Sequence, residues 1–399
     1  MTDTIIITLT VLVLLAYLFD ITSQKTRIPS IILLLFLGWV AKQVSDMSGV
    51  MIPDLSAILP VLGTMGLVLI VLDGALELEF NRQKLPLIGK STGTALISIL
   101  VISFALAGAF RHITGTDYQT CLMNAIPLAI ISSAIAIPSA ESLSSVSREF
   151  IIYESSLSDI FGVLIFNFVL TENNPGIHSV TNLFFQLLLI LIISFAATLL
   201  LAFLLYRVKH SVKFIPIIIL ILLIYSISKL YHLPALLFIL LFGLFIRNID
   251  ELNIKSLREW RYMENLKIEV SRFKELTKEM TFLIRVLFFL LFGFMIDTQN
   301  LLNKETAIWA VAISAGIFVT RILYLWLMKL PLKPLLFIAP RGLITILLFL
   351  SIPASSTLSM VNQSLITQVI IITALVMMAG TINTKKQTDK VETDNTFQE

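Results

Sequence analysis

Long apolar segments recur along this entire chain, and they limit its fold more than any other feature. Several approach the roughly 18 to 20 residues that carry a helix across a bilayer. Only 14% of the 399 residues are charged and the mean hydropathy is +0.93, whereas about a quarter of a soluble domain is charged. We therefore predict an all-α membrane protein in a lipid bilayer, with about 13 transmembrane helices. The segments are 5–21, 28–44, 57–79, 87–110, 119–140, 149–170, 180–206, 212–230, 233–248, 280–297, 305–328, 333–352 and 362–382.

Basic residues between the segments indicate the orientation, because Lys and Arg gather on the cytoplasmic side. If the N-terminus is outside, only four of the 29 Lys and Arg lie in outer connections and three lie within segments. The others fall inside, so we predict an outer N-terminus and a cytoplasmic C-terminus. The first segment lacks the basic region and cleavage site of a signal peptide, so it is expected to stay as a span. We place the protein in a bacterial inner or plasma membrane.

An internal repeat divides the transmembrane part. RIPSIILLLFLGWVAK (27–42) and HLPALLFILLFGLFIR (232–247) share a Pro, a Gly and a final basic residue at an offset of 205. The predicted topology runs the two copies in opposite directions, as in secondary transporters with alternating access. We predict inverted repeats at about 5–170 and 212–382 with a connector span at 180–206.

Two segments outside the spans complete the predicted organisation. The transmembrane domain comprises 1–248 and 280–384, and 249–279 is expected to be a cytoplasmic amphipathic linker helix. Residues 385–399 are short and polar, so we predict a disordered tail.

Two spans at corresponding places in the halves are poor continuous helices. Span 5 (119–140) contains Pro127, Ser132, Ser133 and Pro138, and span 12 (333–352) contains Pro340-Arg341-Gly342. Proline removes a backbone donor and clashes with the preceding turn. Matched interruptions indicate a midplane ion site, because freed backbone groups and helix ends can face an ion there. We predict breaks at Pro138, Pro340 and Gly342.

Span 6 carries two acidic side chains in the sequence YESSLSDIFGVLIFNFVL (153–170). Ser155 and Asp159 are four residues apart and share one helix face, and their oxygens suit a small hard cation. Glu154 lies on the neighbouring face and needs a cationic partner, since a buried unpaired charge is costly. Arg341, at the break in span 12, is the candidate for this ion pair.

Other ionisable side chains fall within spans. We interpret Asp73, next to Gly74, as a second carboxylate near the ion site, and Glu77 as interfacial. Arg285 and Arg321 lie nearer span ends and are expected to bind lipid headgroups or to connect helices. For Asp159 a functional role is the default, because ionisable groups in mid-membrane are costly and rare.

At these residues the chain resembles the monovalent cation:proton antiporter superfamily, in particular its sodium/proton exchanger branch. The matching stretches are the Pro-to-Gly block at 29–38, LDGALELEF (72–80), ISSAIAI (131–137), ESSLSD (154–159) and APRGLITILLFLSIP (339–353). The resemblance covers nearly the whole chain. It implies about 13 helices in an inverted repeat, crossed broken helices at spans 5 and 12, a mobile core and a homodimer.

The resemblance also implies roles for residues. Asp159 would be the transport aspartate, with Ser155, Asp73 and Ser133 at the ion-binding site, and Glu154 with Arg341 would be a structural ion pair. Where the branch carries Thr-Asp at the break of span 5, this chain has Ser133-Ala134, and Ser158 replaces the usual Asn or Asp before the aspartate.

We therefore expect a secondary transporter that exchanges Na⁺ for H⁺, one proton per cation, and contributes to pH homeostasis. A K⁺/H⁺ antiporter of the same fold, a cation channel and a membrane sensor are the alternatives. We see no catalytic dyad or metal motif and predict no enzyme activity. Apart from transported Na⁺, K⁺ or Li⁺ and H⁺, we expect no cofactor and no nucleic-acid partner.

Overall fold

A computed structural model describes residues 2–26, 29–48, 57–79, 84–140, 143–171, 188–189, 192–201, 214–231, 235–248, 264–296, 298 and 302–396. Within these ranges the regular structure is helical and there is no strand, so the predicted all-α class is confirmed there. The elements are α1 (Thr2–Thr26), α2 (Ser30–Ser48), α3 (Ile58–Glu77), α4 (Leu85–Thr114), α5 (Tyr118–Ala129), α6 (Ser133–Ala140), α7 (Ser145–Thr171), α9 (Phe214–Leu230), α10 (Ala235–Arg247), α12 (Glu264–Phe294), α14 (Lys304–Leu327), η3 (Leu335–Phe337), α15 (Leu343–Leu350), η4 (Ala354–Ser356) and α16 (Gln363–Thr396).

Membrane-length helices follow from the apolar segments. By length and composition, six helical stretches of the described chain can cross a bilayer: Ser30–Ser48, Ile58–Glu77, Leu85–Thr114, Tyr118–Ala140, Lys304–Leu327 and Gln363–Ile382. The predicted connector span at 180–206 lies largely outside the described residues, although Ile192–Leu201 forms a short apolar helix. The expected spans 5 and 12 are each divided into two shorter elements.

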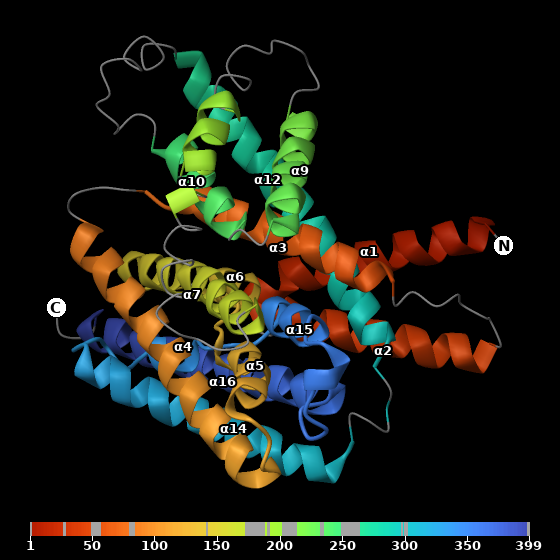
Figure 1. Cartoon of the computed structure of the whole chain (residues 1–399). Coiled ribbons are helices and arrows are strands. Elements are labelled where there is room, and N and C mark those ends of the chain that lie inside the picture. Colours follow the sequence, from red (N-terminus) through yellow and green to blue (C-terminus); the bar gives the residue numbers. More distant parts are fainter. Residues whose placement is uncertain are drawn as a thin grey trace.

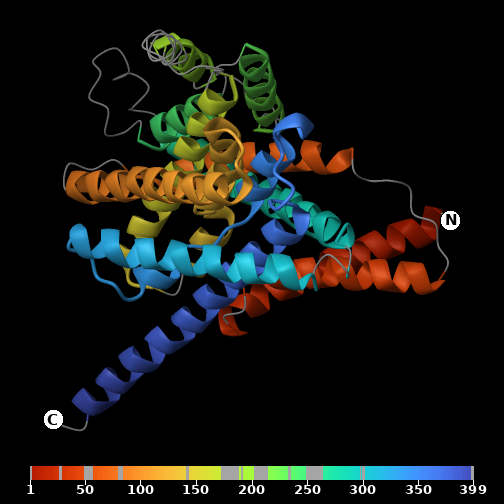
Figure 2. The ribbon, with the colours of Figure 1, turned by 60° about the horizontal axis from the view of Figure 1, so that its bottom comes forward.

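The helices form two groups, and each group takes helices from both halves of the chain. In the first group, α2 and α3 pack against α12, α3 also packs against α10, and α1 and α9 join this set (Figure 1). In the second group, α4 packs against α5, α7 and α14, while α14 packs against α16 and η3. Figure 2 shows α4 and α14 lying side by side in this second group. The groups meet where α15, α6 and α7 contact α3.

Glycines allow the closest helix approaches within the first group. A Cβ atom added to Gly38 of α2 would lie 2.2 Å from the carbonyl oxygen of Leu290 on α12. One added to Gly243 of α10 would lie 2.5 Å from the Cβ of Ala75 on α3. Gly38 and Gly243 are the equivalent glycines of the predicted repeat, and each allows its helix to pack tightly against a neighbour.

The structure differs from expectation at the C-terminal boundary of the predicted linker and in the predicted tail. The predicted boundary at residue 279 is wrong, because α12 runs without interruption from Glu264 to Phe294. Its first half buries Val270 and Phe273 and is continuous with the tenth span, whereas 249–263 lie outside the described residues. α16 continues as a helix to Thr396, through most of the tail that we expected to be disordered.

The interruption of span 5 lies at residues 130–132, between α5 and α6. The prediction that Pro138 marks this break is wrong, because Pro138 lies inside α6, as Pro127 lies inside α5. The interruption of span 12 covers 338–342 and contains Pro340 and Gly342, between η3 and α15. The two breaks touch: the backbone N–H of Ser132 donates to the carbonyl oxygen of Pro340 at 2.9 Å.

Candidate functional site

Asp159 lies in the middle of α7, where it is only 1% exposed. Its Oδ2 accepts hydrogen bonds from the backbone N–H of Ser133, at 3.3 Å, and from the Ser133 hydroxyl. Ser133 is the first residue of α6, so the carboxylate lies at a helix N-terminus, where the backbone dipoles favour negative charge. Its Oδ1 is buried and has no hydrogen-bond partner in the described part of the chain. One oxygen is therefore held in place while the other is open to a ligand.

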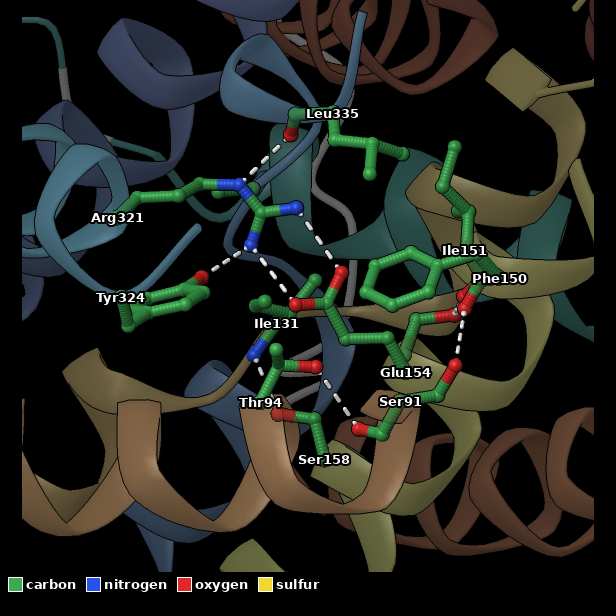
Figure 3. A network of polar contacts seen from close by, with 12 residues as sticks. Ser91, Thr94, Ile131, Phe150, Ile151, Glu154, Ser158, Arg321, Tyr324 and Leu335 are labelled. Carbon is green, nitrogen blue, oxygen red and sulfur yellow. Dashed lines mark hydrogen bonds and ion pairs between the residues drawn. The ribbon is translucent and has the colours of Figure 1, made fainter. Parts of the chain in front are cut away.

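Ser158, next to Asp159, satisfies a backbone group that the broken helix leaves unpaired. The N–H of Ile131 donates to its Oγ at 3.0 Å (Figure 3). A buried N–H without a partner costs about as much as a lost hydrogen bond. The departure from Asn or Asp at position 158 therefore leaves a side chain that still stabilises the break.

Arg341 is fully buried at the break of span 12. Its guanidinium donates to the carbonyl oxygens of Leu128, Ala129 and Ala339, at 2.7, 3.2 and 2.8 Å. Leu128 and Ala129 end α5, where the helix leaves carbonyls unpaired and the dipole favours a cation. Arg341 thus joins the two breaks through backbone carbonyls.

The predicted pairing of Glu154 with Arg341 is wrong. Glu154 pairs instead with Arg321 of α14, through Nη1 to Oε1 at 3.1 Å and Nη2 to Oε2 at 2.9 Å. Figure 3 shows the two side chains face to face. Both are 1% exposed, and Arg321 also donates to the Leu335 carbonyl oxygen at 2.7 Å and to the Tyr324 hydroxyl. This fork-to-fork pair fastens α7 to α14 and η3.

Ser155 does not direct its hydroxyl proton to Asp159. Its Oγ donates to the carbonyl oxygen of Ile151, four residues back on α7, at 2.7 Å. The lone pairs of the oxygen remain available, so the predicted role of Ser155 in holding a cation stays a prediction.

Asp73 lies on α3, next to Gly74, where α3 packs against α7. The charged groups that act on it electrostatically are Glu77 on its own helix and Lys278, Arg285 and Lys274 on α12. Its Oδ1 is buried and unpartnered within the described ranges. A Cβ on the adjacent Gly74 would lie 2.9 Å from the Ser156 Oγ, so the absence of a side chain lets α7 approach α3 at this level.

Sequence reasoning missed Arg321 and Tyr324 as parts of the site. Arg321 was expected at a span end, but it lies deep within the apolar helix α14 with Tyr324 three residues later on the same face. An arginine inside a 24-residue apolar helix was the signal that could have found this partner.

The arrangement holds one open carboxylate oxygen between the ends of broken helices. Among the described residues, no three His, Cys, Asp or Glu side chains gather as metal ligands. A cavity of about 330 Å³ lies close by, between the helix groups. Its lining comes from α3, α7, α9, α10 and α15 and includes Ile160, the neighbour of Asp159. Such a site suits a small, singly charged occupant that binds reversibly.

Comparisons with known proteins agree with this geometry. The family described as "Sodium/hydrogen exchanger, transmembrane" matches residues 10–383. A structure of the sodium proton antiporter MjNhaP1 from Methanocaldococcus jannaschii at pH 8 superposes with a TM-score of 0.67 and 19% identity, covering 96% of this chain and 98% of that chain. A structure from an electron-microscopy map of the same antiporter superposes with a TM-score of 0.64 and 19% identity, covering 96% of this chain and 95% of that chain. A search of curated proteins found no match. The structural likeness extends over almost the whole fold.

Proposed function

This chain belongs to the sodium/hydrogen exchanger family, a family of membrane transporters rather than enzymes, and we propose that it exchanges Na⁺ for H⁺ by alternating access. The observation that carries the proposal is the state of Asp159. One of its oxygens is fixed by the N-terminus of α6, and the other is buried without a partner among the described residues.

A carboxylate in this position accepts either a proton or a cation, but not both. Burial makes the bare anion costly, because no water compensates the charge. Either occupant neutralises it, whereas the empty carboxylate crosses the membrane interior poorly. This competition couples the two flows, with no covalent chemistry and no resident cofactor.

One proton for each cation is the expected stoichiometry. Among the described residues that lie at the N-terminus of α6, Asp159 supplies the carboxylate that exchanges the proton, since Ser133-Ala134 and Ser158 contribute none. A single titrating group that alternates between H⁺ and a monovalent cation moves no net charge, so the exchange is electroneutral.

Alternating access also needs two parts that move against each other. The two helix groups meet chiefly at α3 on one side and at α6, α7 and α15 on the other, and Arg285 of α12 also donates to the Ala134 carbonyl oxygen of α6. The equivalent packings of Gly38 against α12 and Gly243 against α3 support an inverted repeat of the two halves. The contact of the two breaks at Ser132 and Pro340 supports crossed broken helices around Asp159.

The remaining features of the proposal concern the whole assembly. We place the protein in a bacterial inner membrane with the N-terminus outside and the C-terminus in the cytoplasm, as the basic connections favour. We also propose a homodimer, as the resemblance implies. Ser155 and Asp73 are proposed to hold the cation together with Asp159.

Exchange in proteoliposomes tests the proposal. Purified protein is reconstituted with an internal pH dye, and external Na⁺, Li⁺ or K⁺ is added. We expect alkalinisation with Na⁺ that Asp159→Asn abolishes. The matched control is Asp117→Asn, because Asp117 lies at the N-terminus of α5 and accepts from the Thr120 N–H, a role that Asn also fills. Normal exchange by Asp159→Asn would refute the proposal.

The same assay separates the alternatives. A response to K⁺ without Na⁺ would make the protein a K⁺/H⁺ antiporter. Flux of cations without a counter-flow of protons would indicate a channel. Absence of both cation and proton flux would leave a membrane sensor as the remaining alternative.

A further inference from the structure

Four buried oxygens on α3 and α7 have no hydrogen-bond partner in the described part of the chain. They belong to Glu77, Asp73, Ser156 and Asp159. The proposed exchange accounts for the open oxygen of Asp159, and Asp73 is a proposed ligand of the cation at Asp159. Glu77 and Ser156 have no role in either.

Ser156 is one of several buried hydroxyls that have no hydrogen-bond partner in the described part of the chain, as Ser132 and Ser314 are. A buried serine in a membrane helix commonly donates to the carbonyl four residues earlier, as Ser155 does to Ile151 and Ser91 to Leu87. Ser156 is only 2% exposed and makes no such bond. Its Oγ lies against Gly74, the neighbour of Asp73. An unsatisfied hydroxyl in a membrane interior is costly, and the Ser156 oxygen is available to a ligand beside Gly74.

Glu77, Asp73 and Ser156 follow one another toward Asp159, starting from the end of the fold at which α3 ends. At that end the Tyr153 hydroxyl of α7 donates to the Glu79 carbonyl oxygen, just after α3, at 2.7 Å. Glu77 lies about one turn beyond Asp73 toward this end, since four residues of helix rise roughly 6 Å. Asp159 follows Ser156 by three residues on α7, or roughly 4.5 Å.

The end at which this row begins is charged and polar. Lys84, before α4, contacts Glu149 at 2.9 Å and Glu79 at 3.6 Å, and Arg247 at the end of α10 also pairs with Glu79. By the predicted topology this is the cytoplasmic face. The row of oxygens therefore leads from the cytoplasmic water layer to the buried carboxylate.

We propose that Glu77, Asp73 and Ser156 form a second binding site for a monovalent cation, which the ion occupies on its way between the cytoplasm and Asp159. This inference rests on the proposed function and extends it. The donors are two carboxylates and a hydroxyl, which are hard oxygen ligands.

The neighbouring cations of α12 adjust the strength of this second site. Lys278, Arg285 and Lys274 are positive groups whose charges act on Asp73. Their field weakens the hold of the carboxylates on a passing cation. A transit site requires this, because an ion must be able to leave as well as enter.

Transport kinetics of Ser156→Ala test the inference in oriented vesicles. Loss of one cation ligand is expected to raise the apparent KM for Na⁺ about fivefold, with little change in kcat, when Na⁺ is supplied at the cytoplasmic face. Supply at the outer face should leave KM within twofold. Glu77→Gln should shift KM in the same direction, and Ser156→Thr should restore it, because threonine keeps the hydroxyl.

Ser91→Ala serves as the matched control, since it removes a buried serine hydroxyl from α4 whose partners are the carbonyl oxygens of Leu87 and Phe150 rather than a carboxylate. A KM for Ser156→Ala equal to that of the control would overturn the inference. So would an equal shift at both faces. These failures differ from failure of the proposed function, which is decided by exchange in Asp159→Asn. If Ser156→Ala does not fold, the KM of Glu77→Gln at the cytoplasmic face decides.

Discussion

Arg321 and Arg341 are both fully buried in the second helix group, yet their charges are compensated in different ways. Arg321 faces the carboxylate of Glu154 through two parallel hydrogen bonds. The Arg341 guanidinium donates, within the described part of the chain, to carbonyl oxygens at the end of α5 and at Ala339 in the break of span 12. A buried cation can therefore be stabilised by an opposite charge or by the dipole of an interrupted helix.

The difference determines what each substitution leaves behind. Removing Arg321 leaves a buried carboxylate alone, whereas removing Arg341 leaves neutral carbonyls. A lone buried charge costs more than an unpaired dipole. The two arginines are thus expected to differ in their effect on stability, although their burial is the same.

The largest effect is expected for Arg321→Gln, which leaves Glu154 buried without its partner. We expect a loss of about 3–5 kcal/mol in the free energy of unfolding, measured by denaturant titration in mixed micelles. The double variant Arg321→Gln/Glu154→Gln should recover part of this loss, because the orphan charge is gone. Strict additivity of the two single variants would contradict the pairing.

A smaller effect is expected for Arg341→Gln, since three carbonyl oxygens lose a charged donor but no charge is orphaned. We expect a loss of about 1.5–3 kcal/mol. Its coupling to Glu154→Gln in a double-mutant cycle should stay well below that of Arg321. Equal coupling of both arginines to Glu154 would erase the distinction between them.

The smallest effect is expected for Tyr324→Phe, which removes only the hydroxyl that accepts from Arg321. We expect a loss of about 1 kcal/mol in the same unfolding assay. Combined with Arg321→Gln it should add almost nothing, because the donor is already absent. A full additional loss in that combination would place the hydroxyl outside the Arg321 network.

The two broken helices show how far sequence reasoning reaches. Pro340 and Gly342 lie within the break of span 12, because proline cannot continue a helix and its predecessor avoids the helical region. The break of span 5 contains no proline. It lies where Ser158, Pro340 and Arg341 supply partners to Ile131, Ser132 and the end of α5. These partners come from other elements, so no local pattern marks the position.

The sequence by itself determined the membrane class, the apolar spans and the unusual carboxylates within them, because hydropathy and helical period are local properties of the chain. Only the tertiary structure decided that Glu154 pairs with Arg321, that α5 ends at Ala129, and that Ser156 lies against Gly74. Buried charges and freed backbone groups need partners, and in a bilayer the protein must supply them. Which residue does so depends on which helices lie side by side, and that is a property of the assembled fold.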